Sequence, residues 1–240
     1  MSSRRVLILG GCGRVGRALG CALQADGWEL LLTARDEAEL EACRDRKPAL
    51  HARRAVVELS DPEPAQAALE ELLEETPVDQ VVLSFGQPWS EGELLHATVD
   101  ELDRLWADQI RSQFVALRQL LPRLAPASTF LMINGSTALA PSPGRGLANL
   151  GAAATLMLQR VIAAEADDDQ ARVVSLLLQG AVDAEDLPAD RVLSGEALAE
   201  AVRSLWEIES PAAVYSLRPQ QELRRLELSA HEAADLEELA

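Results

Sequence analysis

The chain has 240 residues, 48% of them hydrophobic, and its 39 acidic and 22 basic residues give it a formal net charge of −17. This apolar content suffices for one substantial core, whereas the negative charge excludes nucleic acids and acidic membranes as expected partners, because their phosphates would be repelled. No apolar run reaches the roughly 20 residues that cross a bilayer, and the N-terminal apolar run is too short for a signal peptide, so we expect a cytoplasmic protein.

Apolar strand-like runs alternate with segments of helical periodicity, which is typical of a parallel sheet covered by helices on both faces. We predict seven strands, at Val6–Gly10, Glu29–Thr33, Ala55–Leu59, Gln80–Phe85, Thr129–Ile133, Arg172–Leu178 and Ala213–Ser216. We predict six helices between them, at Arg14–Ala25, Asp36–Arg44, Pro62–Glu74, Val99–Leu124, Ala148–Ala166 and Gly195–Trp206. This order predicts a doubly wound α/β Rossmann fold, formed by residues 1–218 as a single domain. The acidic remainder, 219–240, is predicted to form a helical tail from Glu222 through Glu238.

A glycine-rich turn follows the first predicted strand and leads into the first predicted helix. It contains the overlapping spacings Gly11-x-Gly13-x-x-Gly16 and Gly10-x-x-Gly13-x-x-Gly16. Glycines at such a turn allow a sharp bend, admit a pyrophosphate against bare backbone and bring the helix close to the sheet. The turn therefore predicts dinucleotide binding, with a purely structural turn as the alternative. The residues expected to contact the nucleotide here are Gly10, Gly11, Gly13, Arg14, Val15 and Gly16.

The end of the second predicted strand reads Leu32-Thr33-Ala34-Arg35. Proteins that prefer NAD carry an acid at this point, which holds the ribose hydroxyls, whereas an arginine attracts the 2′-phosphate of NADP. Arg35 therefore favours NADP(H) over NAD(H), and Arg14 in the glycine-rich turn can assist it. The alternative is a solvated arginine at the start of a helix. Asp36 is expected to cap that helix, with Glu39 as its capping-box partner.

Together with the glycine-rich turn, five later segments resemble the short-chain dehydrogenase/reductase family in order and content. These segments are Val56–Asp61, Val78–Gly86, Thr98–Pro122, Phe130–Ser136 and Gln179–Val182. The resemblance covers residues 4 to 218 and implies a Rossmann fold, a bound dinucleotide and a homodimer or tetramer, assembled through the helices near 99–124 and 148–166. It also implies nucleotide contacts at Glu58, Leu59, Ser84, Phe85, Gly86, Gly180 and Val182.

The departures from the family fall on the residues that carry out its chemistry. The family uses a Tyr as proton donor and, four residues later, a Lys that lowers the pKa of the Tyr and holds the nicotinamide ribose. Aligning the chain with the family places Leu150 and Ala154 at these two positions. The only Tyr and the only Lys of the chain, Tyr215 and Lys47, fall in other predicted elements, so no shift of the alignment restores the pair.

Two side chains remain as candidates for catalysis. Ser136 corresponds to the family's Ser, which hydrogen-bonds the substrate carbonyl, and Gln109 corresponds to its fourth-helix Asn. His96 is a second choice of acid, for which a surface role is favoured, and Trp89 is expected either at the mouth of the pocket or at a subunit contact. The three cysteines have no metal-ligand spacing, so no metal site is expected.

Three hypotheses of function follow from this mixture of kept and lost features. The first is a nucleotide-binding protein of short-chain-dehydrogenase fold whose reductase chemistry is lost or weak, acting as a sensor, scaffold or partner subunit. The second is an NADP-dependent oxidoreductase that acts on a carbonyl, enone or quinone-like small molecule through a rearranged site using Ser136. The third is a structural homo-oligomer with an empty nucleotide cleft.

Overall fold

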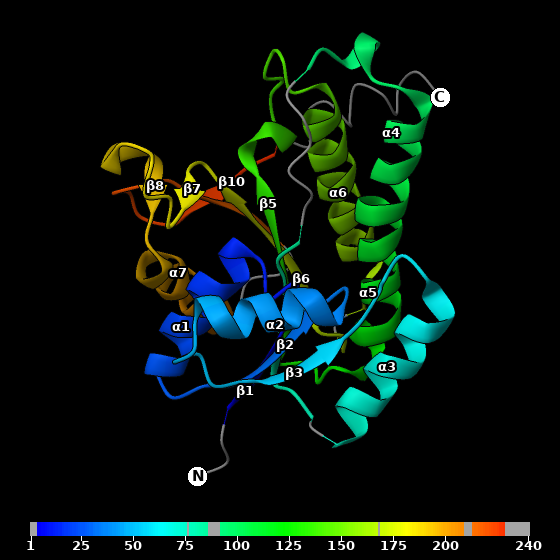
Figure 1. Ribbon diagram of the computed structural model, residues 1–240, viewed down its shortest axis with the longest axis vertical. Helices are drawn as coiled ribbons and strands as arrows, with labels where there is room; N and C mark the ends of the chain where they lie inside the picture. The colour runs from blue at the N-terminus through cyan, green and yellow to red at the C-terminus, as the bar shows by residue number, and fades with distance from the viewer. Residues whose placement is uncertain (1–3, 76, 86–91, 168, 209–212, 229–240) are drawn as a thin grey trace.

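The computed structural model describes residues 4–75, 77–85, 92–167, 169–208 and 213–228. Its centre is an eight-stranded sheet in the order β10-β9-β6-β5-β4-β1-β2-β3 (Figure 1). The strands are β1 Arg5–Leu9, β2 Glu29–Ala34, β3 Arg53–Val56, β4 Gln80–Leu83, β5 Thr129–Gly135, β6 Arg172–Leu178, β9 Val214–Leu217 and β10 Arg224–Leu226. Seven strands are parallel, β10 runs antiparallel to β9, and the strand order reverses between β1 and β4. The predicted doubly wound fold is therefore confirmed.

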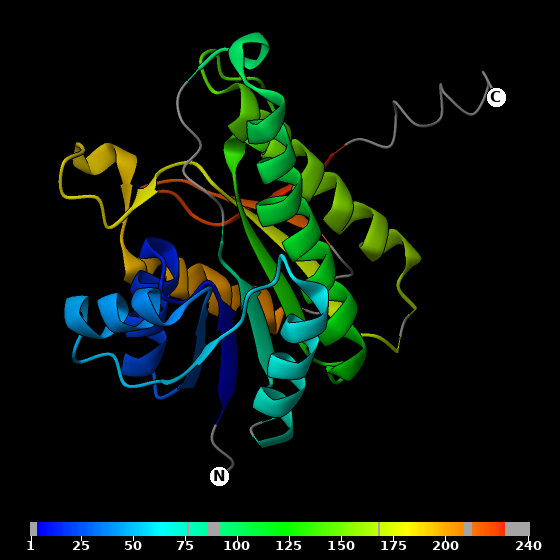
Figure 2. The ribbon, with the colours of Figure 1, turned by 45° about the vertical axis from the view of Figure 1, so that its right-hand side comes forward.

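Helices cover both faces of this sheet (Figures 1 and 2). They are α1 Arg14–Ala25, α2 Glu37–Arg46, α3 Pro62–Glu75, α4 Val99–Leu105, α5 Ser112–Leu120, α6 Gly146–Glu165 and α7 Gly195–Glu207. Helices α1, α2 and α7 contribute buried side chains to the core on one face, and α3 and α5 contribute to the core on the other, with α6 packed beside them. Short 3-10 turns lie at Leu94–His96, Leu121–Arg123, Ser136–Ala138 and Ala189–Arg191.

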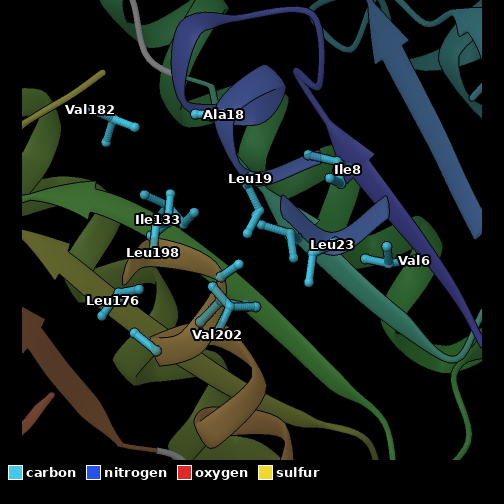
Figure 3. Close-up of a cluster of buried hydrophobic side chains, with 14 of the residues drawn as sticks. Val6, Ile8, Ala18, Leu19, Leu23, Ile133, Leu176, Val182, Leu198 and Val202 are labelled. Atoms are coloured by element: carbon cyan, nitrogen blue, oxygen red, sulfur yellow. The ribbon is translucent and has the colours of Figure 1, made fainter. Parts of the chain in front are cut away.

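Alternation along the central strands divides the buried side chains between the two cores. In β1, Val6 and Ile8 belong to one core, and Leu7 between them belongs to the other. In the first core, the strands meet α1 and α7, as Figure 3 shows for Leu19 and Leu198. Because strands buried on both faces are apolar at every position, they appear in the sequence as continuous apolar runs.

The predicted fourth helix forms one helical run, from α4 through a π turn at Trp106–Arg111 into α5. A capping box starts it: Thr98 N donates to Glu101 Oε2 at 2.8 Å, and Glu101 N donates to Thr98 Oγ1 at 3.2 Å. The hydrogen bonds that Thr98 donates to Glu101 Oε2 from its backbone amide and from its hydroxyl lower the pKa of Glu101. A π turn inserts an extra residue into a helix and is frequent at functional sites. Here it carries the buried side chain of Gln109.

Among the described residues, α6 is the one helix that is long and apolar enough to cross a membrane, judged by length and composition alone. In the fold it packs against β5 and β6 and beside the π turn of the fourth helix. It therefore serves as one of the helices that cover the sheet.

The C-terminal helix predicted from Glu222 is wrong for residues 222–228, where the chain adds the antiparallel strand β10 to the sheet. Leu226 and Leu228 pack against a small core at this edge, so long-range pairing and burial outweigh the local helical composition. Residues 229–238 of the predicted helix lie outside the described residues. Two further strands, β7 Ala181–Val182 and β8 Val192–Leu193, form a separate pair that the sequence did not predict.

Candidate functional site

The glycine-rich turn joins β1 to α1. At several of its glycines, an added Cβ would clash with backbone or with packed side chains. Gly10 has a φ of 71°, a left-handed conformation that favours glycine. A Cβ on Gly16 would lie 2.6 Å from the Cα of Gly11, so α1 packs directly on the turn. Gly13 precedes α1, and no side chain caps the helix there. The amides of the first helical turn are therefore available to an anion.

Cys12 lies within this turn and is buried in the same core as Cys43 of α2. Burial, reinforced by the neighbouring Cys43, raises the pKa of the Cys12 thiol to about 12. A thiol with such a pKa is uncharged and unreactive at neutral pH. Cys12 consequently acts as a small packing group beside the nucleotide-binding turn.

A cleft of about 720 Å³ opens at the carboxyl ends of β1, β2, β4 and β5. Doubly wound proteins bind their ligands at this edge of the sheet, at the point where the strand order reverses, and the volume is in the range of small-molecule sites. Nine of the residues predicted to contact a nucleotide line the cleft: Gly10, Gly13, Arg14, Val15, Arg35, Glu58, Leu59, Ser84 and Phe85. Glu58 and Leu59 stand on the loop after β3, which ends at Val56 rather than at the predicted Leu59.

Four other predicted nucleotide contacts lie among the described residues but do not line the cleft. Gly11 and Gly16 serve the close packing of the turn described above. Gly180 packs against the chain that follows β9, and Val182 is buried in the core on the strand pair β7 and β8. Contact of these last two residues with a nucleotide stays a prediction. Gly86 lies outside the described residues.

Two features of the cleft suit a dinucleotide. The Oγ of Ser84 is buried and has no hydrogen-bond partner among the described residues, although Ser84 lines the cleft. Such a hydroxyl costs free energy unless a ligand supplies the missing bond. At Gly13, a Cβ would lie 3.2 Å from the carbonyl oxygen of Gly10, so glycine leaves bare backbone where a phosphate can approach. The residues present therefore fit a bound dinucleotide.

Arg35 follows β2 and lines the cleft, but its guanidinium is already engaged. Its Nε and Nη2 donate to Oε1 of Glu39 at 3.1 and 2.5 Å, and its backbone amide donates to Oε2 at 3.2 Å. Asp36 Oδ1 accepts from the amide of Glu39 at 2.8 Å, so half of the predicted capping box forms. The Glu39 carboxylate turns instead to Arg35, a charge-assisted partner. The bond to Glu39 raises the pKa of Arg35, which is a cation throughout the physiological range.

One part of the cleft, here called the reaction end, is lined by polar residues from the end of β5 and from the π turn. Gln109 lines it from a buried position, and its Nε2 donates to Thr155 Oγ1 at 3.4 Å. Asn134 and Thr137 also line the cleft, whereas the predicted Ser136 is half-buried and does not. Sequence reasoning missed Asn134 and Thr137, although their position around Ser136 at the end of a strand was the available signal.

Helix α6 presents small apolar side chains to this end of the cleft. Ala148 and Ala152, four residues apart, line it. Leu150 is exposed and Ala154 does not line the cleft, so the alignment that placed those two at the Tyr and Lys positions differs by two residues from the cleft-facing register. Neither register contains a Tyr or a Lys.

The chain's only Tyr and Lys lie away from the cleft. Tyr215 is buried within β9, in the core formed with α7. Lys47 ends α2. His96 is exposed, with its Nδ1 3.6 Å from Glu93 Oε2, and is not a cleft residue. Trp89 lies outside the described residues.

The fold and the cleft define a protein of the dinucleotide-binding, doubly wound class. Residues 14–207, from α1 through α7, match a family model described as Enoyl-(Acyl carrier protein) reductase. The chain therefore belongs to the short-chain dehydrogenase/reductase family. No curated protein is similar enough in sequence to count as a match.

Solved structures of similar fold include several with a nucleotide bound. ElxO with NADP bound has a TM-score of 0.77 and 14% identity, over 90% of this chain and 97% of that one. An alcohol dehydrogenase from the archaeon Thermococcus sibiricus, complexed with 5-hydroxy-NADP, has a TM-score of 0.76 and 22% identity, over 92% of this chain and 98% of that one. A 3-ketoacyl-(acyl-carrier-protein) reductase from Brucella melitensis, complexed with NADH, has a TM-score of 0.76 and 19% identity, over 90% of this chain and 97% of that one. At these identities the likeness shows the shared fold.

Proposed function

We propose that the protein binds NADP(H) in this cleft and has lost, or nearly lost, the proton transfer of the family's reductases, so that it acts as a nucleotide sensor, scaffold or partner subunit. Three features support binding: the bare glycine-rich turn, the hydroxyl of Ser84, which no described residue partners, and Arg35 at the end of β2. A bound dinucleotide would supply a hydride. The first turn of α1 would hold its pyrophosphate, and Arg35 its 2′-phosphate.

The observation that carries the loss of chemistry is the pair of alanines on α6. The two side chains that face the cleft at a spacing of four residues are Ala148 and Ala152, which neither donate a proton nor lower the pKa of a donor. A positioned general acid contributes about 10²–10⁴ in rate, and residues that act as a unit contribute more together. Hydride transfer to a plain ketone is therefore expected to be slow in this cleft.

Nucleotide titration followed by thermal unfolding tests the binding half of the proposal. A ligand that binds the folded state alone, at about 100 times its Kd, adds about 2.7 kcal/mol to the free energy of unfolding. We expect NADPH to raise the melting temperature, and a panel of aldehydes and ketones to leave NADPH unoxidised. Ordinary turnover would contradict the lost chemistry. No thermal shift at saturating nucleotide would contradict binding and favour the structural role with an empty cleft.

The polar lining at the reaction end favours a second candidate function, an NADP-dependent oxidoreductase with a rearranged site. Thr137 and Gln109 line this end of the cleft beside Asn134, whose side-chain amide is already bonded to Ala152 O and Gly135 N. Conjugated double bonds and quinone-like acceptors need less help from a protein acid than plain ketones do, because positioning is the main requirement for hydride transfer. Activity toward such acceptors that falls in Thr137→Val, and less in Ser136→Ala, would support this candidate. Activity unchanged in both variants would contradict it.

We also propose that two copies pair through the face formed by α4, α5 and α6. Five large apolar side chains on this face are between 44% and 72% exposed: Val99, Trp106, Phe114, Met157 and Val161. Single exposed apolar residues are ordinary, but a set on adjacent helices is typical of an interface. Light scattering at micromolar concentration should give a dimer or tetramer. Phe114→Asp with Met157→Asp should give a monomer, and Leu187→Asp, exposed elsewhere, should not. A monomeric unmodified protein would contradict this assembly.

A further inference from the structure

The ion pair at the end of β2 places the Glu39 carboxylate beside Arg35, the cation that the proposed NADP(H) site needs for the 2′-phosphate. Arg35 and Glu39 both line the cleft, and Glu39 receives the Nε and Nη2 donors of Arg35 on a single oxygen. We propose that Glu39 is a specificity-determining residue, which holds Arg35 and thereby limits the preference of the cleft for a 2′-phosphorylated nucleotide. This inference rests on the proposed function, since it concerns the same site.

Glu39 is held in position for this role by its own helix. Its amide donates to Asp36 Oδ1, which fixes the first turn of α2, and its Oε2 accepts from the backbone amide of Arg35. The carboxylate therefore bridges the backbone and the side chain of one residue. This arrangement keeps a negative charge beside the guanidinium in the absence of nucleotide.

The pair is open to competition from a ligand. The side chains of Arg35 and Glu39 are 52% and 37% exposed, and ion pairs exposed to this degree are weak because solvent screens them. A phosphate offers the guanidinium more charge and a bidentate geometry, so it is able to displace the carboxylate. Displacement leaves Glu39 next to the phosphate, however, and like charges at short range repel. Binding of a 2′-phosphate thus has an opposing contribution that a 2′-hydroxyl does not meet.

The surrounding charges strengthen this argument. Two arginines line the cleft, Arg14 and Arg35, against three carboxylates, Glu39, Glu58 and Asp108. The Glu58 carboxylate accepts from both the amide and the Oγ of Ser60, at 2.9 and 2.7 Å, so it is engaged within its own loop. Among the carboxylates that line the cleft, Glu39 is the one that accepts hydrogen bonds from Arg35. Removing its charge leaves two arginines facing two carboxylates in the cleft.

The test compares Kd values for NADPH and NADH, measured by nucleotide fluorescence at constant salt. Glu39→Gln keeps the size of the side chain and removes its charge. We expect it to tighten NADPH binding about tenfold and to change NADH binding less than about twofold, because one removed like charge at short range is of that order. Glu41→Gln is the matched control, since it removes the same charge from an exposed position of α2 that does not line the cleft. The control should leave both Kd values unchanged.

A double-mutant cycle with Arg35→Ala separates the two parts of the effect. Without Arg35, Glu39→Gln should tighten NADPH less than it does in the unmodified protein, because there is no guanidinium to release. A gain of equal size in both backgrounds, or an unchanged ratio of the NADPH and NADH Kd values in Glu39→Gln, would overturn the inference while leaving the proposed function intact. Failure of every variant to bind either nucleotide would overturn both. Melting temperatures of the variants verify that each one is folded.

Discussion

The nucleotide end of the cleft, at the glycine-rich turn, and the reaction end, beside α6, differ in whether the fold itself requires their residues. At the nucleotide end, Gly11 and Gly16 are needed for the packing of α1 on the turn, whether or not a ligand binds. At the reaction end, α6 packs with Ala148 and Ala152 toward the cleft, and the fold needs neither a Tyr nor a Lys there. The nucleotide end therefore persists with the fold, whereas the reaction end can lose its chemistry without losing the fold. Membership in this family implies the architecture and does not imply the reaction.

The largest expected effect is at the turn, where Gly16→Ala should disrupt the feature that the fold and the ligand share. The added Cβ would lie 2.6 Å from backbone, so α1 must shift, and we expect a loss of about 3 kcal/mol in the free energy of unfolding together with loss of NADPH binding. Gly20→Ala, four residues later in α1, meets side chains at 3.5 Å and should be neutral or stabilising by up to about 1 kcal/mol. Urea unfolding and NADPH titration measure both effects, and equal behaviour of the two variants would contradict the steric argument.

The second effect concerns the reaction end, where the missing pair can be rebuilt. Ala148→Tyr with Ala152→Lys should raise the reduction of an activated ketone by about tenfold or more, a fraction of the ~10²–10⁴ that a well-placed acid supplies. Leu150→Tyr with Ala154→Lys is the control, because neither residue lines the cleft. NADPH oxidation followed by absorbance gives the rates. A gain in the control pair alone would contradict the cleft-facing register.

Ala152 is buried, so the double variant has to be checked for folding by its melting temperature. Ala148→Tyr alone, at a half-buried position, provides a second variant that restores only the proton donor. Its rate should lie between those of the unmodified protein and the rebuilt pair.

A smaller effect is expected at Ser84, which follows β4 and lines the cleft. Ser84→Ala removes a buried hydroxyl that has no partner in the described part of the chain, so the free protein should keep its stability or gain up to about 1 kcal/mol. NADPH binding should weaken by about threefold to tenfold if the nucleotide supplies the missing hydrogen bond. Thermal unfolding with and without NADPH shows both changes. Destabilisation of the free protein would mean that the hydroxyl already has a partner.

The smallest effect is the pH dependence that Cys12 contributes. Because the folded-state pKa is raised to about 12 from 9.0, the folded protein holds this proton more tightly than the unfolded chain. The resulting stability is fully present below pH 9 and is lost as pH rises from 9 toward 12. At pH 10 we expect a loss of about 1 kcal/mol, which Cys12→Ala should not show. Urea unfolding at pH 8 and pH 10 measures this difference, and identical pH dependence in the two proteins would refute it.

The sequence predicted the parallel sheet because each central strand is buried on both faces and stands out as an apolar run, as in Val6–Leu9. It did not predict β10, because the residues after Glu222 have helical composition and their strand pairing depends on the distant β9. Local patterns carry no information on such a partner. The same limit explains the missed pair β7 and β8.

For the site, the glycine-rich turn and Arg35 were predictable, since their chemistry is encoded in adjacent residues. The role of Glu39 was misjudged because a capping box and an ion pair with Arg35 use the same carboxylate, and only the structure shows which partner takes it. The alignment with the family placed its Tyr and Lys at Leu150 and Ala154, whereas Ala148 and Ala152 are the residues of α6 that line the cleft, because the sequence does not show which side of this helix faces the cleft.

The most direct test of the contrast between the two ends is a stopped-flow experiment on NADPH bound to the protein. Fluorescence reports NADPH binding, and absorbance then reports its oxidation when a carbonyl substrate is added to the saturated complex. We expect saturable binding followed by oxidation far slower than the roughly 1–1000 per second of typical enzymes. Oxidation within that range, or no binding of NADPH at all, would contradict a kept nucleotide end joined to a lost reaction end.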